Sequence, residues 1–169
     1  MRHLWLIGMM GSGKSHVGRR IAELSGHPFV DTDDRIVFES GRSIGDMFEA
    51  DGEAEFRSVE ETALRSAAAE PVAVIATGGG AVLSDANVEV MRRSGTVVYL
   101  EADPTTLARR VGADESRPLL KARDPLGAMT EILNRRGGLY RAAAHVTIQS
   151  DDRDLDEVAR EAIAVWNES

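Results

Sequence analysis

Residues 4–15 read Leu-Trp-Leu-Ile-Gly-Met-Met-Gly-Ser-Gly-Lys-Ser, an apolar run followed at once by a glycine-rich segment. The spacing from Gly8 to Ser15 fits G-x-x-x-x-G-K-[ST], the phosphate-binding loop that joins a strand to a helix. Glycines in such a loop let backbone N–H groups point at a phosphate, and the following helix adds its positive dipole end. Lys14 can then reach the β- and γ-phosphates, and the Ser15 hydroxyl can ligate Mg²⁺. A tight strand-to-helix turn is the alternative, but the full pattern favours nucleotide binding.

Composition narrows the class of protein. At 169 residues the chain is expected to form a single domain, residues 1–169. The net charge of −8 argues against a nucleic-acid or membrane-surface binder. Cysteine is absent, which excludes disulfides and thiolate catalysis, and the four histidines show no metal-ligand spacing. Because an apolar strand begins next to Met1 and no run is long enough to span a membrane, we expect no signal peptide and a cytoplasmic location.

Short apolar runs alternate with amphipathic stretches along the chain. We expect strands at residues 3–7, 28–31, 72–76, 96–100 and 145–149. We expect helices at residues 14–24, 33–39, 44–49, 53–69, 85–93, 104–110 and 125–143, the last of these interrupted at Gly137-Gly138. A final helix is expected after the capping pair Asp154 and Glu157, and it ends at about residue 166. This alternation predicts a parallel sheet covered on both faces, with ligands at the carboxyl ends of the strands. Residues 112–124 lack periodicity and are a candidate mobile loop.

Two motifs follow predicted strands. After the second strand comes Asp31-Thr32-Asp33, where one carboxylate could bind Mg²⁺ and the other could accept a hydrogen bond from a substrate hydroxyl. Alternatively, Asp33 or Asp34 simply caps the next helix. After the third strand comes Gly78-Gly79-Gly80, which allows close backbone approach to a ligand, although a plain flexible turn is the alternative.

Arginines supply candidate anion sites. Arg57 and Glu60 could form an inconsequential surface ion pair, or Arg57 could be held beside an aromatic wall of Phe48 and Phe56. Arg136 could bind a carboxylate bidentately, or it could interact with the carboxyl end of its own helix.

Another arginine lies in the predicted loop. Arg117, within residues 112–124, is placed like the charge clamp of a closing lid, or is a solvated surface residue.

Taken together, these motifs resemble those of shikimate kinase, a small P-loop kinase family of aromatic amino-acid biosynthesis. Six segments occur in the family's order and at similar spacings: residues 8–15, 31–33, 56–60, 78–80, 117–120 and 136–140. The resemblance implies a three-layer α/β P-loop fold with a five-stranded parallel sheet of order 2-3-1-4-5. It also implies a substrate-binding helical region at about 32–60, a mobile lid at about 112–124, and a monomer. The implied reaction moves the γ-phosphoryl group of ATP to the 3-hydroxyl of shikimate, with Mg²⁺ as cofactor.

The resemblance also implies residue roles. The implied catalytic residues are Lys14, Asp33 and Arg117, where Asp33 orients or deprotonates the attacking hydroxyl and Arg117 neutralises the transferring phosphate. The implied ATP-binding residues are Gly11, Ser12, Gly13, Lys14, Ser15, His16, Arg110 and Arg117, with Arg110 stacked on adenine. The implied metal-binding residues are Ser15 and Asp31. The implied shikimate-binding residues are Asp33, Phe48, Phe56, Arg57, Glu60, Gly78, Gly79, Gly80 and Arg136. Among these, Arg57 and Arg136 would hold the carboxylate, and Glu60 would orient Arg57.

One departure from the family pattern bears on this site. The family often has proline two residues before Tyr140, where this chain has Gly138, and we expect glycine to loosen the turn after Arg136. A related small-molecule kinase, such as a gluconate kinase, and a nucleotide-binding regulatory protein without catalysis remain the alternative functions.

Overall fold

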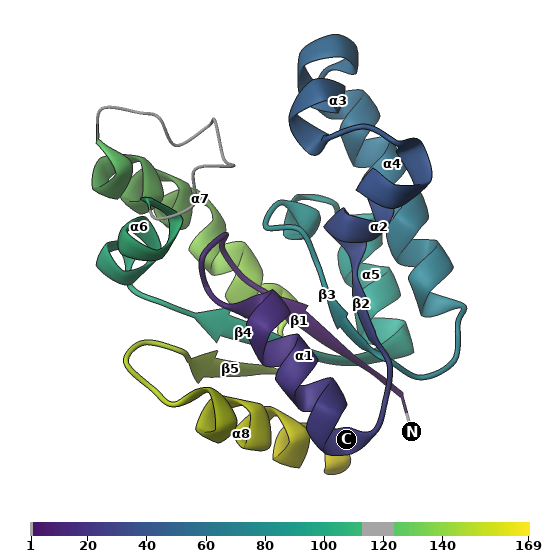
Figure 1. Cartoon of the computed structure of the whole chain (residues 1–169), viewed down its shortest axis with the longest axis vertical. Helices are drawn as coiled ribbons and strands as arrows, with labels where there is room; N and C mark the ends of the chain where they lie inside the picture. Colours follow the sequence, from purple (N-terminus) through teal and green to yellow (C-terminus); the bar gives the residue numbers. More distant parts are fainter. Residues whose placement is uncertain (1, 113–123) are drawn as a thin grey trace.

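The computed structural model describes residues 2–112 and 124–169, and five apolar runs in them form one parallel sheet (Figure 1). The strands are β1 (His3–Ile7), β2 (Phe29–Asp31), β3 (Val74–Ala76), β4 (Gly95–Glu101) and β5 (Val146–Gln149). Their order across the sheet is β2-β3-β1-β4-β5, and every neighbouring pair is parallel. The predicted fold class and strand order are therefore confirmed.

Helices cover both faces of the sheet, which explains why the central strand is an uninterrupted apolar run. The helices are α1 (Lys14–Ser25), α2 (Thr32–Ser40), α3 (Ile44–Asp51), α4 (Glu53–Ala68), α5 (Asp85–Ser94), α6 (Pro104–Gly112), α7 (Pro125–Ala143) and α8 (Leu155–Asn167), with a short 3-10 helix η1 (Ala81–Leu83). Leu4 and Leu6 of β1 belong to one core cluster with α1 and α8, whereas Trp5 and Ile7 belong to a second cluster with α4, α5, α6 and α7.

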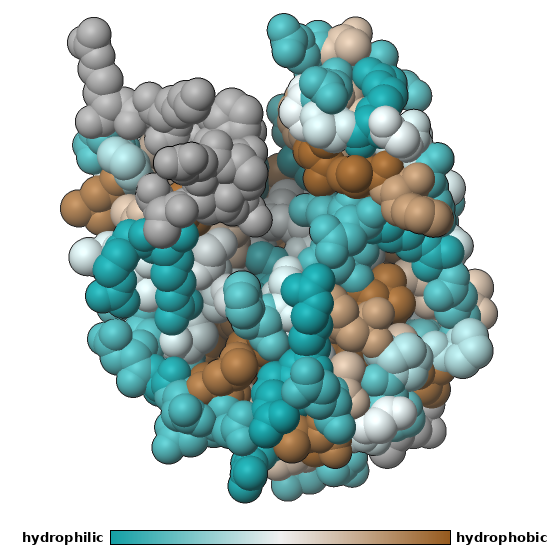
Figure 2. All heavy atoms as spheres, in the orientation of Figure 1, coloured by the Kyte–Doolittle hydropathy of each residue, from teal (hydrophilic) through white to brown (hydrophobic). Residues whose placement is uncertain are grey.

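Helices α2, α3 and the start of α4 form a lobe beside the sheet, at the upper right of Figure 1. Ile36, Met47, Phe56 and Ala63 give this lobe a small core of its own. The lobe corresponds to the substrate-binding region expected at about residues 32–60. Figure 2 shows a mostly hydrophilic face with an apolar area over α2, the helix on which Phe38 is 89% exposed.

The interruption predicted at Gly137-Gly138 is wrong, because α7 runs unbroken from Pro125 to Ala143. Glycine in a helix interior costs about 1 kcal/mol relative to alanine. Burial of Met129 and Tyr140 in the core on either side of the pair offsets that cost and keeps the helix continuous. The chain after Arg136 is helical and forms no turn, and a loosening effect of Gly138 stays a prediction.

The lid expected at about 112–124, with Arg117 in it, falls on residues 113–123, which lie outside the described residues. Across residues 2–112 and 124–169, none of the helices combines the length and the apolar character needed to cross a bilayer.

Candidate active site

The phosphate-binding loop leaves the carboxyl end of β1 and enters α1. Glycine is required at position 11, because its φ is +80° and a Cβ there would lie 2.7 Å from Val111 Cγ2. Lys14 Nζ donates to the carbonyl oxygens of Gly8 and Met9, each at 2.8 Å, which holds the ammonium against the loop. Within residues 2–112 and 124–169, no side chain caps the amino end of α1, so its first N–H groups can face an anion.

Ser15 and Asp31 form the candidate metal-binding pair. Ser15 Oγ donates to Asp31 Oδ2 at 2.6 Å. The other carboxylate oxygen of Asp31 accepts from the backbone N–H groups of Asp33 and Asp34. Adjacent hydroxyl and carboxylate oxygens are the hard donors that Mg²⁺ prefers, so the pair fits this ion once phosphate oxygens and water complete its shell.

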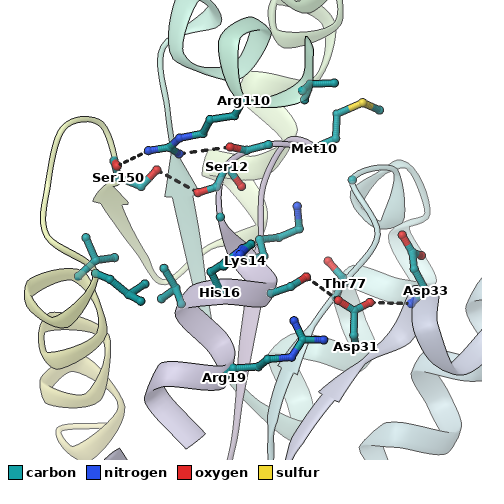
Figure 3. Close-up of a pocket in the computed structure, with 18 of the residues that line it drawn as sticks. Met10, Ser12, Lys14, His16, Arg19, Asp31, Asp33, Thr77, Arg110 and Ser150 are labelled. Atoms are coloured by element: carbon teal, nitrogen blue, oxygen red, sulfur yellow. Dashed lines mark hydrogen bonds between the residues drawn. The ribbon is translucent and has the colours of Figure 1, made fainter. Parts of the chain in front are cut away.

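Asp31 is the N-cap of α2, so the expectation that Asp33 or Asp34 caps this helix is wrong. Asp31 still has the extended backbone of β2, with φ −105° and ψ 119°, which lets its carboxylate turn back to the first N–H groups of the helix. The Asp33 side chain is thereby left to face the cleft (Figure 3).

A cleft of about 730 Å³ opens over the loop. Figure 3 shows Arg110 and Ser150 on one side of it and Asp31 and Asp33 on the other. Arg110 donates to the carbonyl oxygens of Gly11 at 3.2 Å and Ser150 at 3.1 Å, so α6 is joined to both the loop and the end of β5. The predicted residues that line the cleft are Gly11, Ser12, Gly13, Lys14, Ser15, His16, Asp31, Asp33, Gly79 and Arg110.

Arg57 lies on α4 within a set of charged and aromatic partners. Its guanidinium donates to Glu60 Oε2 at 2.8 Å and to Glu53 Oε1 at 3.3 Å. Its Cζ lies 5.4 Å from the ring centroid of Phe56 and 5.8 Å from that of Phe48. The pair with Glu60 is not a surface pair, because the Glu60 side chain is only 1% exposed. Burial raises the pKa of Glu60, and the positive charge of Arg57 opposes that rise.

The Gly78–Gly80 turn brings Asp33, Glu60 and Arg57 to one place. A Cβ on Gly78 would lie 2.6 Å from Asp33 Oδ1 and 2.9 Å from Glu60 Oε1. A Cβ on Gly80 would lie 2.3 Å from Arg57 Nη2. Side chains from α2 and α4 therefore pack closely against this turn, and an acidic and a basic group lie beside it.

Arg136 lies on α7, and its charge affects Glu60 and Tyr140. Its positive charge lowers the pKa of Glu60 and of Tyr140, although burial is the larger effect and raises the pKa of Tyr140 to about 12. The hydroxyl of Tyr140 donates to the carbonyl oxygen of Gly79. An interaction of Arg136 with the carboxyl end of its helix is ruled out as the alternative, because α7 continues to Ala143.

Several residues that line the cleft were missed by the sequence-based reasoning. They are Met10, Val17, Arg19, Asp34, Thr77, Val111, Ser150, Arg153, Leu155 and Val158. Ser150 and Arg153 belong to the connection after β5, and Leu155 begins α8. The rule that ligands sit at the carboxyl ends of parallel strands could have drawn attention to these three residues.

Comparisons with known proteins agree with this geometry. The family model described as shikimate kinase matches residues 10–167. Shikimate kinase of Symbiobacterium thermophilum is 47% identical over 158 residues, which cover 92% of this chain and 91% of that protein. Shikimate kinase of Moorella thermoacetica is 43% identical over 167 residues, which cover 97% and 95% of the two chains.

A solved structure is similar over nearly all of both chains. Shikimate kinase from Acinetobacter baumannii in complex with shikimate superposes with a TM-score of 0.94 at 34% identity, covering 99% of this chain and 94% of that one. The match of the family model and these identities establish that the chain belongs to the shikimate kinase family.

Proposed function

We propose that the protein transfers the γ-phosphoryl group of ATP to the 3-hydroxyl of shikimate, giving shikimate 3-phosphate and ADP for aromatic amino-acid biosynthesis. Membership in the shikimate kinase family supports this reaction. The observation that carries the proposal is the meeting of two sites at one sheet edge. The phosphate-binding loop follows β1, and the Gly78–Gly80 turn, with Asp33 and Arg57 against it, follows the neighbouring strand β3.

The loop side would bind the nucleotide. Lys14, the loop N–H groups and the amino end of α1 would stabilise negative charge on the phosphates. Ser15 and Asp31 would hold Mg²⁺ through oxygen, and the ion would neutralise charge on the β- and γ-phosphates. Arg110 and His16 line the same cleft, and Arg110 would contact the adenine. Arg117, from the segment outside the described residues, would add positive charge beside the transferring group.

The turn side would bind shikimate. Arg57 and Arg136 would grip the carboxylate, with Glu60 holding the guanidinium of Arg57 in place at 2.8 Å. Phe48 and Phe56 would pack against the ring of the substrate, and Gly78, Gly79 and Gly80 would admit it close to the backbone. The carboxylate of Asp33 would accept a hydrogen bond from the attacking hydroxyl and orient it, so that positioning and charge stabilisation supply most of the catalysis.

We further propose that the chain is a single domain that acts as a monomer in the cytoplasm. The single parallel sheet, with strands in the order β2-β3-β1-β4-β5, supports the one-domain part of this proposal.

The test is ADP release in the presence of ATP and Mg²⁺, with shikimate, quinate, gluconate or no acceptor. The expected result is release that depends on shikimate, with shikimate 3-phosphate identified by mass spectrometry, and none in a Lys14→Ala variant. Release that gluconate stimulates and shikimate does not would overturn the proposal in favour of a related small-molecule kinase. ATP binding without release with any acceptor would favour a regulatory protein.

A further inference from the structure

Tyr140 joins two parts of the acceptor site that come from different layers of the fold. Its side chain is fully buried, and its hydroxyl donates to the carbonyl oxygen of Gly79 in the turn after β3. Arg136 precedes it by four residues in α7, so the two side chains lie on the same face of the helix. Tyr140 therefore contacts the glycine turn directly and shares a helix face with Arg136, the proposed carboxylate-binding arginine.

We infer that Tyr140 is a positioning residue for shikimate, which sets the spacing between Arg136 on α7 and the backbone of the Gly78–Gly80 turn. The inference rests on the proposed function, because it assigns the role through the acceptor site. Tyr140 itself need not touch the substrate in this role.

The hydrogen bond has a direct effect on the turn. Three consecutive glycines have wide conformational freedom, so the turn needs outside contacts to keep one shape. Because a peptide unit is planar and trans, fixing the Gly79 carbonyl also fixes the Gly80 N–H, which points the opposite way. Gly80 is the residue against which the Arg57 guanidinium lies, so the orientation of this peptide bears on both sides of the site.

The ring of Tyr140 is itself held in place. It stacks on the ring of Tyr99 in β4, with centroids 5.0 Å apart and an interplanar angle of 18°. Stacking on a strand of the central sheet limits the movement of the Tyr140 hydroxyl. Among the described residues, the buried Tyr99 hydroxyl has no hydrogen-bond partner. The two stacked tyrosines therefore differ in that only the Tyr140 hydroxyl forms a hydrogen bond within the described residues.

This difference supplies a matched pair of variants, Tyr140→Phe and Tyr99→Phe. Each removes one buried hydroxyl from the same stacked pair and keeps the ring. For Tyr140→Phe we expect the KM for shikimate to rise about three- to ten-fold, the usual worth of one hydrogen bond, with the KM for ATP within about twofold of wild type. For Tyr99→Phe we expect both constants to stay unchanged.

A binding measurement distinguishes a specific effect on shikimate from a general loss of the folded state. Shikimate and ATP affinities of both variants are measured by titration calorimetry at low temperature, alongside the thermal melting curve. Weaker shikimate binding with intact ATP binding supports the inference. Equal weakening of both ligands, or unchanged shikimate binding in Tyr140→Phe, overturns it.

Different results would overturn the proposed function and the proposed role of Tyr140. If the wild type releases no ADP with shikimate, the proposed function fails, and the inference fails with it. If the wild type is active and the two variants behave alike, the inference alone fails.

Discussion

The guanidinium of Arg57 occupies the space into which a side chain at Gly80 would project. An ideal Cβ on Gly80 would lie 2.3 Å from Nη2 and 2.4 Å from Nη1 of Arg57. The same guanidinium donates to Glu60 Oε2 at 2.8 Å, which helps to hold it there. Position 80 therefore has room for a hydrogen atom only, as long as Arg57 keeps this place.

Replacing Gly80 by alanine should displace Arg57 and leave the fold largely intact, because the clash involves the end of a flexible side chain. We expect kcat/KM for shikimate to fall about tenfold or more, since small misplacements of a binding group are costly, with the KM for ATP nearly unchanged. Steady-state kinetics with each substrate varied would check this. Gly45→Ala is the control, because in the part of the chain that the structure describes a Cβ there would meet only Ser43 Oγ, at 3.8 Å. Equal losses for both substrates would contradict the assignment.

We expect Glu53 to compete with an anionic substrate for Arg57. Its carboxylate lies 3.3 Å from Arg57 Nη2 and is mostly exposed to solvent. Glu53→Gln should therefore lower the KM for shikimate about two- to fivefold at low salt, with a smaller change at high salt because charge effects are screened. The matched control is Glu61→Gln, which breaks a similar ion pair with Arg65 on the same helix. A higher KM in Glu53→Gln would mean instead that Glu53 holds Arg57 in position.

Glu60 should make stability depend on pH. Burial raises its pKa above the ordinary value of 4.5, so its ionisation opposes folding. Its favourable contribution is fully present below about pH 4.5 and is lost as the pH rises through the folded-state pKa. Glu60→Gln should then equal or exceed the wild type in free energy of unfolding at neutral pH, and this difference should shrink toward pH 4.5. Urea titrations at several pH values would measure it.

The same variant should lose activity. Among the described residues, Arg57 would keep only the exposed Glu53 as an anionic partner, so we expect kcat/KM for shikimate to fall about tenfold. A variant that is both less stable and fully active would contradict this account of Glu60.

The part of this site that could be predicted from sequence is formed by residues that are close together along the chain. The phosphate-binding loop is a contiguous pattern whose glycines, lysine and serine are all neighbours along the chain, and its strand and helix flank it directly. The alternation of apolar and amphipathic runs likewise predicted a parallel sheet, because a strand buried on both faces must be apolar throughout.

Other features depend on contacts between distant residues. Nothing local to Gly80 indicates that Arg57 lies against it, because α4 and β3 must first pack together. The choice of Asp31 as the N-cap of α2 depends on where the helix begins to within a residue or two, which spacing alone could not decide. Ser150 joins the cleft through its carbonyl oxygen and its hydroxyl, which bond Arg110 and the Ser12 carbonyl, and such contacts leave no motif.

Asp33→Asn separates two roles for this carboxylate. A general base usually contributes about 10²- to 10⁴-fold, so loss of a true base should lower kcat by at least a hundredfold with little change in the KM for ATP. Single-turnover measurements of phosphoryl transfer would isolate the chemical step. Near-normal turnover would leave Asp33 only the role of orienting the hydroxyl.

Gly138 offers a stabilising substitution beside the site. It is exposed and helical within α7, and a Cβ there would meet no atom of the described residues within 4 Å. Gly138→Ala should therefore raise the free energy of unfolding by about 1 kcal/mol, because alanine has the higher helix propensity and a less flexible unfolded chain. For a domain of this size that corresponds to an increase of about 2–4 °C in Tm, which calorimetry can resolve. Because Arg136 lies on an already continuous helix, the KM for shikimate should not change. A rise in that KM would mean that catalysis uses the flexibility that glycine gives this part of α7.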